Sequence, residues 1–210
     1  MIWVLTGFMG CGKTTIGRLV ARMAAASASC LPPETGTGSQ KKSPPATSPE
    51  RGELRFVDLD EEIVLREGRS IPEIFADGGE AAFRAVERTT LAELLSEADG
   101  NLLISLGGGT LTDPESRALV HDFCRCIYLR ASVETLAANL RWEGESASRP
   151  MLAGADPEAP AESPDSLESR IAAMMATRGP IYEKAADVII DIDGHDYSSI
   201  ARQLFGSFSL

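Results

Sequence analysis

Residues 7–15 read GFMGCGKTT, and this stretch decides how the rest of the chain is interpreted. Gly7, Gly12, Lys13 and Thr14 fit the pattern G-x-x-x-x-G-K-[ST], and an apolar run precedes them. Glycine lets the backbone curl until consecutive N–H groups face phosphate oxygens, and the N-terminus of a following helix adds partial positive charge. The alternative, a glycine-rich turn without a ligand, would leave a lysine buried without an anion. The stretch therefore predicts a strand, a nucleotide-phosphate loop and a helix.

The same stretch predicts how ATP is held. Lys13 should reach the β and γ phosphates, and the Thr14 hydroxyl should be a ligand of Mg²⁺. The expected ATP-binding residues of the loop are Gly10, Cys11, Gly12, Lys13, Thr14 and Thr15.

Short apolar runs alternate with helix-type spacing over the remaining chain. The predicted strands are residues 2–6, 55–59, 102–106, 124–129 and 188–191. The predicted helices are residues 14–26, 70–97, 113–121, 133–141, 167–185 and 196–205. This alternation predicts an α/β fold, a five-stranded parallel sheet with helices on both faces. The phosphate loop makes it a P-loop core, and a mobile lid is expected over residues 143–168.

Two segments of biased composition interrupt this alternation. Thirteen of the twenty residues 31–50 are Pro, Gly, Ser or Thr, which predicts a flexible insertion over residues 27–53. No candidate catalytic residue lies within residues 28–51, so we expect this segment to be dispensable for catalysis. Residues 143–168 are rich in Ala, Pro and acids and form the predicted lid. Neither segment divides the chain, so residues 1–210 are expected to be a single domain.

Composition limits the classes of partner. With 210 residues and a net charge of -11, the chain lacks the basic face that a nucleic-acid binder needs. No run approaches the roughly 20 apolar residues of a membrane span, and the N-terminal run is expected to be a buried strand and not a leader. Four cysteines are few for this length, which fits reduced thiols. We expect a cytoplasmic monomer without nucleic-acid or membrane partners.

Asp58 and Asp60 close the second predicted strand as D-x-D. Period-two alternation would place both side chains on one face, near the carboxyl end of the sheet, where open α/β folds bind ligands. One carboxylate can assist Mg²⁺ through water, and the other can accept the proton of a substrate hydroxyl. The alternative is a helix N-cap with first-turn acids in the run DLDEE.

Five further stretches follow the loop in order: FVDLDEEI, GGEAAFRAVE, SLGGGT, ASRPML and ATRGPIYEKAAD. Together with the phosphate loop they resemble shikimate kinase, and the likeness covers essentially the whole chain outside the two biased segments. The resemblance implies transfer of the γ-phosphoryl group of ATP to the 3-hydroxyl of shikimate, with Mg²⁺ as cofactor. Shikimate 3-phosphate and ADP would be the products, on the chorismate path to aromatic amino acids.

The resemblance also implies roles for particular residues. Asp58 would act on the metal through water, and Asp60 would bind the acceptor hydroxyls. Arg84 and Arg178 would clamp the acceptor carboxylate, since a guanidinium fork fits a carboxylate in a bidentate way. Gly108, in the triple glycine, would donate to the acceptor. Taken alone, Arg84 could equally be a helix-surface ion pair with Glu80 and Glu87, and Arg178 a helix C-terminal charge.

Arg149 is the only basic residue between residues 143 and 168. It could be a solvated charge, or it could close with a lid over the developing charge on the γ phosphate, as the family uses the arginine of its R-P motif. The resemblance makes Arg149 a catalytic residue with Lys13 and Asp60, and an ATP contact. Arg141 is a further candidate for the phosphates, and Ser105 for a water of the Mg²⁺ shell.

Two other functions stay open at this point. The chain could phosphorylate another small hydroxy acid, such as gluconate, although two acceptor-side arginines and the D-x-D pair then need another explanation. It could also be a ligand-sensing module that binds without turnover. The intact Lys13, Thr14, Asp58 and Asp60 argue against that reading, and the acidic composition argues against direct binding to DNA.

Overall fold

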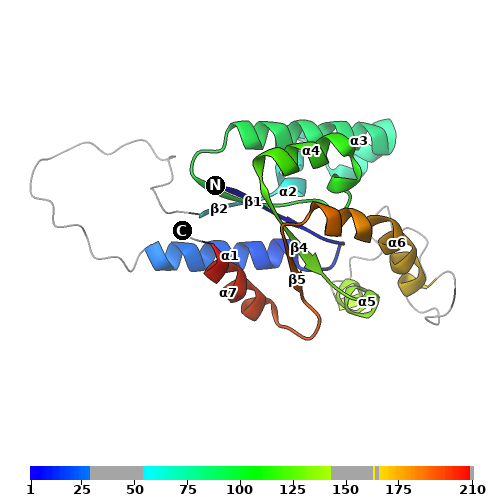
Figure 1. The fold of residues 1–210 in the computed structure, drawn as a ribbon. Coiled ribbons are helices and arrows are strands. Elements are labelled where there is room, and N and C mark those ends of the chain that lie inside the picture. Colours follow the sequence, from blue (N-terminus) through cyan, green and yellow to red (C-terminus); the bar gives the residue numbers. More distant parts are fainter. Residues whose placement is uncertain (29–53, 143–162, 164–165, 209–210) are drawn as a thin grey trace, which may run out of the picture.

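Five parallel strands form a single sheet at the centre of the protein (Figure 1). The computed structural model describes residues 1–28, 54–142, 163 and 166–208. The strands pair in the order β2-β3-β1-β4-β5. Their bounds are β1 Ile2–Thr6, β2 Leu54–Asp58, β3 Asn101–Ser105, β4 Arg125–Arg130 and β5 Val188–Asp191. The predicted parallel sheet is confirmed.

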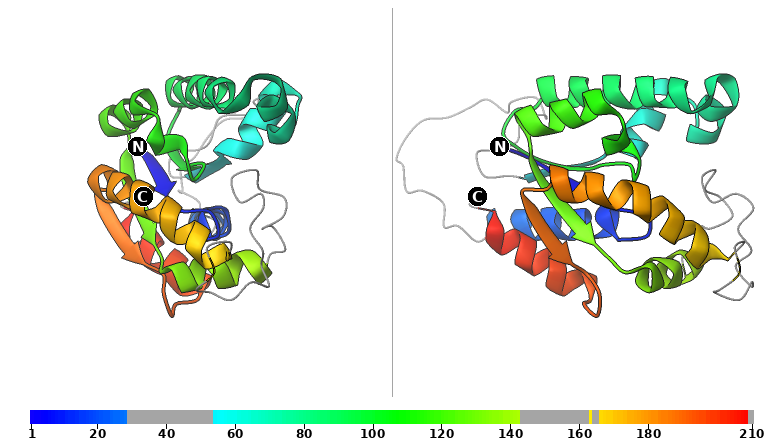
Figure 2. Two further views of the ribbon diagram at one scale, coloured as in Figure 1. Left: turned by 90° about the vertical axis from the view of Figure 1, so that its right-hand side faces the viewer. Right: turned by 45° about the vertical axis from the view of Figure 1, so that its right-hand side comes forward.

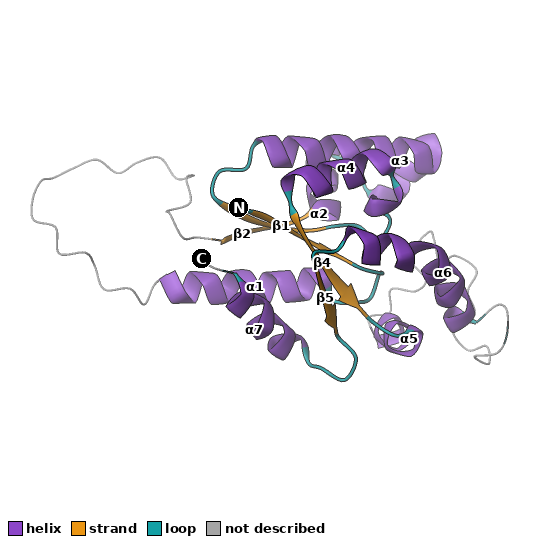
Figure 3. Cartoon of the chain, in the orientation of Figure 1, coloured by secondary structure: helices purple, strands orange, loops and turns teal. Residues whose placement is uncertain are grey.

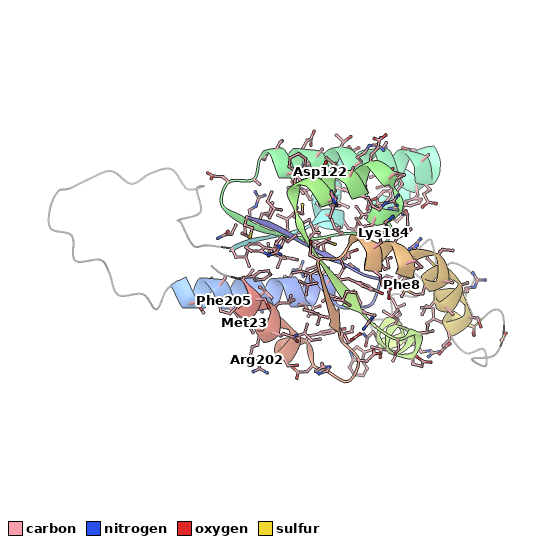
Figure 4. The ribbon with its side chains drawn as sticks, viewed as in Figure 1. Phe8, Met23, Asp122, Lys184, Arg202 and Phe205 are labelled. Carbon is pink, nitrogen blue, oxygen red and sulfur yellow. The ribbon has the colours of Figure 1, made fainter. Side chains whose placement is uncertain are left out.

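Helices cover both faces of this sheet, as predicted (Figures 1 and 2). One face carries α1 (Lys13–Ala28) and α7 (Tyr197–Ser207), and Figure 4 shows Met23 and Phe205 at the contact between them. The opposite side carries α2 (Leu59–Glu67), α3 (Ile71–Ser96), the 3-10 helix η1 (Thr110–Thr112), α4 (Pro114–Phe123) and α6 (Leu167–Ala185). Helix α5 (Val133–Trp142) follows β4 and contacts α6 (Figure 3).

The strand order explains where the site forms. The chain leaves β1 through α1 on one face of the sheet, and it leaves β3 through α4 on the other (Figure 1). β1 and β3 are neighbours, so the two connections diverge and open a crevice at their carboxyl ends. The phosphate loop follows β1, and the triple glycine follows β3. Two sequence-distant glycine turns are therefore brought side by side.

The second strand and the segment after it differ from the prediction. β2 ends at Asp58, and the next residues form α2. Asp58 is the N-cap of this helix: its side chain accepts from the N–H groups of Asp60 and Glu61. The predicted alternation of Asp58 and Asp60 along one strand is therefore wrong, and the N-cap alternative is correct. The short polar helix was missed because its apolar periodicity is weak.

One predicted helix is bent. α3 spans the predicted range, but Gly79 has non-helical backbone angles (φ 68°, ψ -167°) and divides the helix into two segments. The N-terminal segment starts with a capping box between Ser70 and Glu73. The remaining predicted helices and strands agree with the structure to within two residues at each end, the usual uncertainty of element boundaries.

Most of the two biased segments lies outside the described residues, including Arg149. At their edges, Ala28 still belongs to α1, and Leu167 and Glu168 belong to α6. In the parts of the chain that the structure describes, no helix is both long and apolar enough to cross a membrane. Cys11, Cys124 and Cys126, the three cysteines of these parts, are free thiols.

Candidate active site

The phosphate loop encloses the side chain of Lys13. Its Nζ donates to the carbonyl oxygens of Gly7 at 2.9 Å and Phe8 at 3.0 Å, and the residue is only 9% exposed. Gly7, Gly10 and Gly12 all have positive φ angles, which non-glycine residues rarely adopt. The motif residues thus form a tight loop around the Lys13 ammonium group. This positive charge favours binding of a polyanion.

The first residue pair that can hold a metal joins the loop to β2. The Thr14 hydroxyl donates to Asp58 Oδ2 at 2.5 Å, and the register of β2 on β3 places Asp58 beside Ser105. A hydroxyl and a carboxylate are hard oxygen ligands of the kind that Mg²⁺ accepts together with waters and substrate phosphates. Within the described ranges, no three His, Cys, Asp or Glu side chains gather as a protein-only metal site. The donor set therefore fits a metal that arrives with a nucleotide.

A hollow of about 360 Å³ lies over the loop. Its lining combines the loop with the ends of β2 and β3: Met9, Gly10, Gly12, Lys13, Thr14, Thr15, Arg18, Asp58, Asp60, Glu61, Ser105, Leu106, Gly107 and Gly108. All the predicted ATP-loop residues except Cys11 line it; Cys11 is fully buried behind the loop. We call this space the phosphate hollow.

A second, smaller hollow of about 110 Å³ lies next to the first. Its lining contains apolar side chains of α3, the triple glycine, and the predicted acceptor residues: Met9, Asp60, Ile71, Phe75, Phe83, Arg84, Glu87, Gly107, Gly108, Gly109 and Arg178. We call it the acceptor hollow. Met9, Asp60, Gly107 and Gly108 line both spaces, so Asp60 stands where the two hollows meet.

The triple glycine is required by its close neighbours. A Cβ at Gly107 would lie 2.8 Å from Glu87 Oε1, and one at Gly109 would overlap the Arg84 guanidinium. At Gly108 a Cβ would come within 3.3 Å of the Met9 backbone nitrogen. A side chain at Gly107 or Gly109 would therefore displace Glu87 or Arg84 from its place in the hollow, and one at Gly108 would press on the phosphate loop.

Glu87 holds Arg84 in the acceptor hollow. Glu87 is fully buried; its Oε2 accepts from Arg84 Nη1 at 2.6 Å and its Oε1 from the Thr110 hydroxyl at 2.6 Å. Burial acts against the charged guanidinium, but the charges of Glu87 and Glu80 outweigh it, and the pKa of Arg84 is raised. Arg84 Nε is buried and has no hydrogen-bond partner in the described part of the chain. The guanidinium therefore carries one N–H group that the described protein groups leave unmatched.

Arg178 approaches the same hollow from α6. It is 7% exposed, and its Nη1 donates to the Gly108 carbonyl at 3.4 Å. Tyr182, one turn later on the same helix, donates its hydroxyl to that carbonyl. Burial raises the pKa of Tyr182 well above its ordinary value, so the hydroxyl keeps its proton. The predicted role of Gly108 as a donor is not tested, but its carbonyl is already an acceptor for α6.

Several site residues were missed by sequence reasoning. Arg18 of α1 lines the phosphate hollow and pairs with Glu61 of α2. Tyr182 lies four residues after Arg178, and this helical spacing could have placed both on one face. Asn139 of α5 donates to the Gly10 carbonyl, and nothing in the local sequence indicates this contact.

One of the predicted arginines has another partner. Arg141, a candidate for the phosphates, pairs with Glu168 of α6, with Nη1 and Oε1 2.6 Å apart. This ion pair joins the two helices that flank residues 143–165. Arg149, predicted to be catalytic, falls outside the described residues, so its role stays a prediction.

Comparisons with known proteins agree with this site. The family model for shikimate kinase matches residues 47–208. A shikimate kinase of Stenotrophomonas maltophilia is 36% identical over 201 residues, covering 96% of this chain and 88% of its own length. One from Chlorobium chlorochromatii is 34% identical over 200 residues, covering 95% and 86%.

A solved structure supports the same assignment. The shikimate kinase from Acinetobacter baumannii, in complex with shikimate, superimposes with a TM-score of 0.71 at 25% identity, covering 98% of this chain and 91% of that one. The family model covers the D-x-D segment, both acceptor-side arginines and the triple glycine, and the relatives extend the match over nearly the whole chain. This chain belongs to the shikimate kinase family.

Proposed function

We propose that this protein transfers the γ-phosphoryl group of ATP to the 3-hydroxyl of shikimate and releases shikimate 3-phosphate and ADP. The observation that carries the proposal is the junction of two unlike hollows at Asp60. One is built around a buried lysine in a phosphate loop, and the other around the buried Arg178 and the partly buried Arg84, whose Nε has no partner in the described residues. A relative in the same family was solved with shikimate.

The acceptor hollow fits a small carboxylate that carries hydroxyl groups. Arg84 and Arg178 bind the carboxylate, and the apolar Phe75 and Phe83, whose ring centroids are 4.7 Å apart, border one side of the ring. At the opposite end, Asp60 faces the phosphate hollow and accepts a hydrogen bond from the reacting hydroxyl. The two arginines at one end of the substrate and Asp60 at the other hold the reacting oxygen in line with the γ phosphorus.

The transfer forms one bond and breaks one. The acceptor oxygen attacks the γ phosphorus, the bond between this phosphorus and the β–γ bridging oxygen breaks, and ADP leaves. The hydroxyl proton passes to the Asp60 carboxylate. Lys13 moves from its carbonyl partners to the phosphates and neutralises charge there, and Arg149 adds a second cation.

Mg²⁺ is the proposed cofactor. Thr14 would hold it directly and Asp58 through water, and when bound it neutralises charge on the β and γ phosphates. We further propose that the protein works as a cytoplasmic monomer, with no nucleic acid or membrane partner.

The test is release of ADP from MgATP in a coupled assay with shikimate, gluconate, quinate or no acceptor. We expect turnover with shikimate alone and loss of turnover after chelation of divalent cations. Asp60→Asn should reduce kcat by about a hundredfold or more while ATP still binds, because the proton acceptor is lost. Background rates with all acceptors, despite tight ATP binding, would exclude the kinase proposal and favour a sensor. Wild-type kcat in Asp60→Asn would exclude Asp60 as the base.

A further inference from the structure

Two helices outside both hollows support the outer side of the phosphate loop. Gly10 and Gly12 adopt left-handed φ angles of 80° and 82°. A Cβ at Gly10 would lie 2.9 Å from Cγ of Leu140 on α5, and one at Gly12 would lie 2.7 Å from the Tyr197 ring at the start of α7. The loop therefore packs against α5 and α7 without room for side chains at these positions.

One side chain on this outer side makes directed hydrogen bonds. Asn139 Nδ2 donates to the Gly10 carbonyl oxygen at 2.8 Å and to the Tyr197 hydroxyl oxygen at 3.2 Å. A carbonyl can only accept, so the amide nitrogen of Asn139 must face it. Asn139 thus bridges the loop and α7, two segments far apart in the sequence.

The contact fixes the orientation of a peptide unit that belongs to the phosphate loop. No cis peptide occurs in the described residues, so the N–H of Cys11 points away from the Gly10 carbonyl, opposite to Asn139. This N–H donates to the Phe8 carbonyl, with 3.3 Å between nitrogen and oxygen. Rotation of this peptide would change ψ of Gly10 and φ of Cys11, and the hydrogen bonds at its two ends, from Asn139 and to the Phe8 carbonyl, oppose that rotation.

We propose that Asn139 is a positioning residue for the nucleotide phosphates. By holding the Gly10 carbonyl outward, it keeps the neighbouring N–H turned towards the interior of the loop. The Tyr197 hydroxyl orients the Asn139 amide, and the Tyr197 ring supports Gly12. The inference rests on the proposed function only in taking ATP as the nucleotide, and it holds whichever acceptor is used.

The test measures binding of phosphates separately from turnover. ADP and inorganic tripolyphosphate, each with Mg²⁺, are titrated calorimetrically into the wild type, Asn139→Leu, Asn139→Asp and Tyr197→Phe. Loss of one directed hydrogen bond in Asn139→Leu should weaken both ligands about threefold to tenfold. Asn139→Asp should weaken them further, because it sets a carboxylate against a carbonyl. Tyr197→Phe should show a smaller loss.

The controls separate positioning from folding. Glu134→Gln, at an exposed position on the same helix, should bind both ligands like the wild type. The KM for the acceptor should be unchanged in Asn139→Leu. The free energy of unfolding without ligand should fall, because the Gly10 carbonyl is left without its partner, with the protein still folded in the binding assay. Tripolyphosphate lacks the base and the ribose, so an equal loss for both ligands assigns the effect to the phosphate loop.

Three results would overturn the inference. Wild-type affinity of Asn139→Leu for both ligands would remove any role in binding. A loss for ADP alone would mean that Asn139 contacts the nucleoside and not the loop. A loss of binding that is fully accounted for by a smaller folded fraction would reduce its role to folding. If the wild type binds ADP but phosphorylates no shikimate, the proposed function fails. The positioning role of Asn139 is then still tested by the ligand affinities and the stability of Asn139→Leu.

Discussion

At the scale of single residues, the acceptor hollow depends on the buried carboxylate of Glu87, which accepts hydrogen bonds from Arg84 and Thr110. Glu87→Gln leaves Arg84 with one charged partner, the more exposed Glu80, and keeps only one acceptor oxygen for Arg84 and Thr110. Because the lost charge is buried, we expect the free energy of unfolding to fall by about 2 kcal/mol and the KM for shikimate to rise about tenfold or more. Urea unfolding and initial rates measure the two effects.

The matched control removes the other carboxylate on the same arginine. The Glu80 side chain is 52% exposed and lies 3.2 Å from Arg84 Nη2, so Glu80→Gln should change stability by less than about 1 kcal/mol. Equal effects of the two substitutions would show that burial of Glu87 does not organise the hollow.

The buried thiols give a prediction about pH. Burial raises the pKa values of Cys124 and Cys126 to about 12, so both remain protonated at neutral pH. The thiolate is the reactive form, and its fraction grows tenfold per pH unit below the pKa. Alkylation of the folded protein, located by mass spectrometry, should therefore be slow at pH 8 and rise about tenfold per unit up to pH 10. Fast, pH-independent labelling at these two positions would contradict this.

Sequence reasoning found those residues whose role follows from local pattern. Lys13 and Thr14 belong to a contiguous motif, so their placement follows from the strand and helix on either side. Tyr182, Arg18 and Asn139 could not be found in this way. Their partners lie 74, 43 and 129 residues away along the chain, and only the folded sheet brings them together.

At the scale of secondary-structure elements, the bend in α3 shapes the acceptor hollow. Ile71 and Phe75 precede the bend, Phe83 and Arg84 follow it, and all four line the hollow. Gly79 has backbone angles that only glycine adopts without strain, and a Cβ there would meet nothing within 4 Å. Gly79→Ala should therefore cost about 1–3 kcal/mol through backbone strain alone and raise the KM for shikimate.

The matched control is Gly206→Ala, which is the same substitution at a position without backbone strain. Gly206 lies within α7 at an ordinary φ and also has open space around its Cα. Gly206→Ala should leave the KM unchanged and stabilise the protein by up to about 1 kcal/mol. If Gly79→Ala behaves like Gly206→Ala in chemical denaturation and kinetics, the bend is not needed.

Elements with strong apolar periodicity were predicted well, and those governed by a few polar contacts were not. The first four strands are mostly buried apolar runs bounded by turn residues, which is a clear signal, whereas β5 buries only Ile190. α2 is a short polar helix whose start depends on the Asp58 cap, and the bend in α3 depends on one glycine. The start of α2 and the bend in α3 both depend on local backbone geometry, which the spacing of hydrophobic residues does not reveal.

At the scale of the whole molecule, alternation of strands and helices predicted a parallel sheet but not its strand order. The order matters because it places the turn after β1 beside the turn after β3, and with them the phosphate loop beside the triple glycine. Pairing between distant strands follows from packing of the complete chain. The crevice is thus a property of topology, whereas the residues that line it are properties of sequence.

The last prediction concerns the long insertion between α1 and β2. Residues 29–53 contain none of the residues that the sequence motifs assign to nucleotide, metal or acceptor, and Ala28 still belongs to α1. Replacement of residues 29–51 by a short Gly/Ser turn should therefore leave kcat and both KM values within about twofold of the wild type. Closing a shorter loop costs less chain entropy, so stability should be equal or slightly higher.

A second variant separates length from sequence. It replaces the same residues by a Gly/Ser linker of equal length, and we expect it to match the wild type in steady-state kinetics. A tenfold loss of kcat in the short variant alone would show that the span between α1 and β2 needs the extra length. The same loss in both variants would show that side chains of the insertion take part in the reaction, and the site would then extend beyond the two hollows.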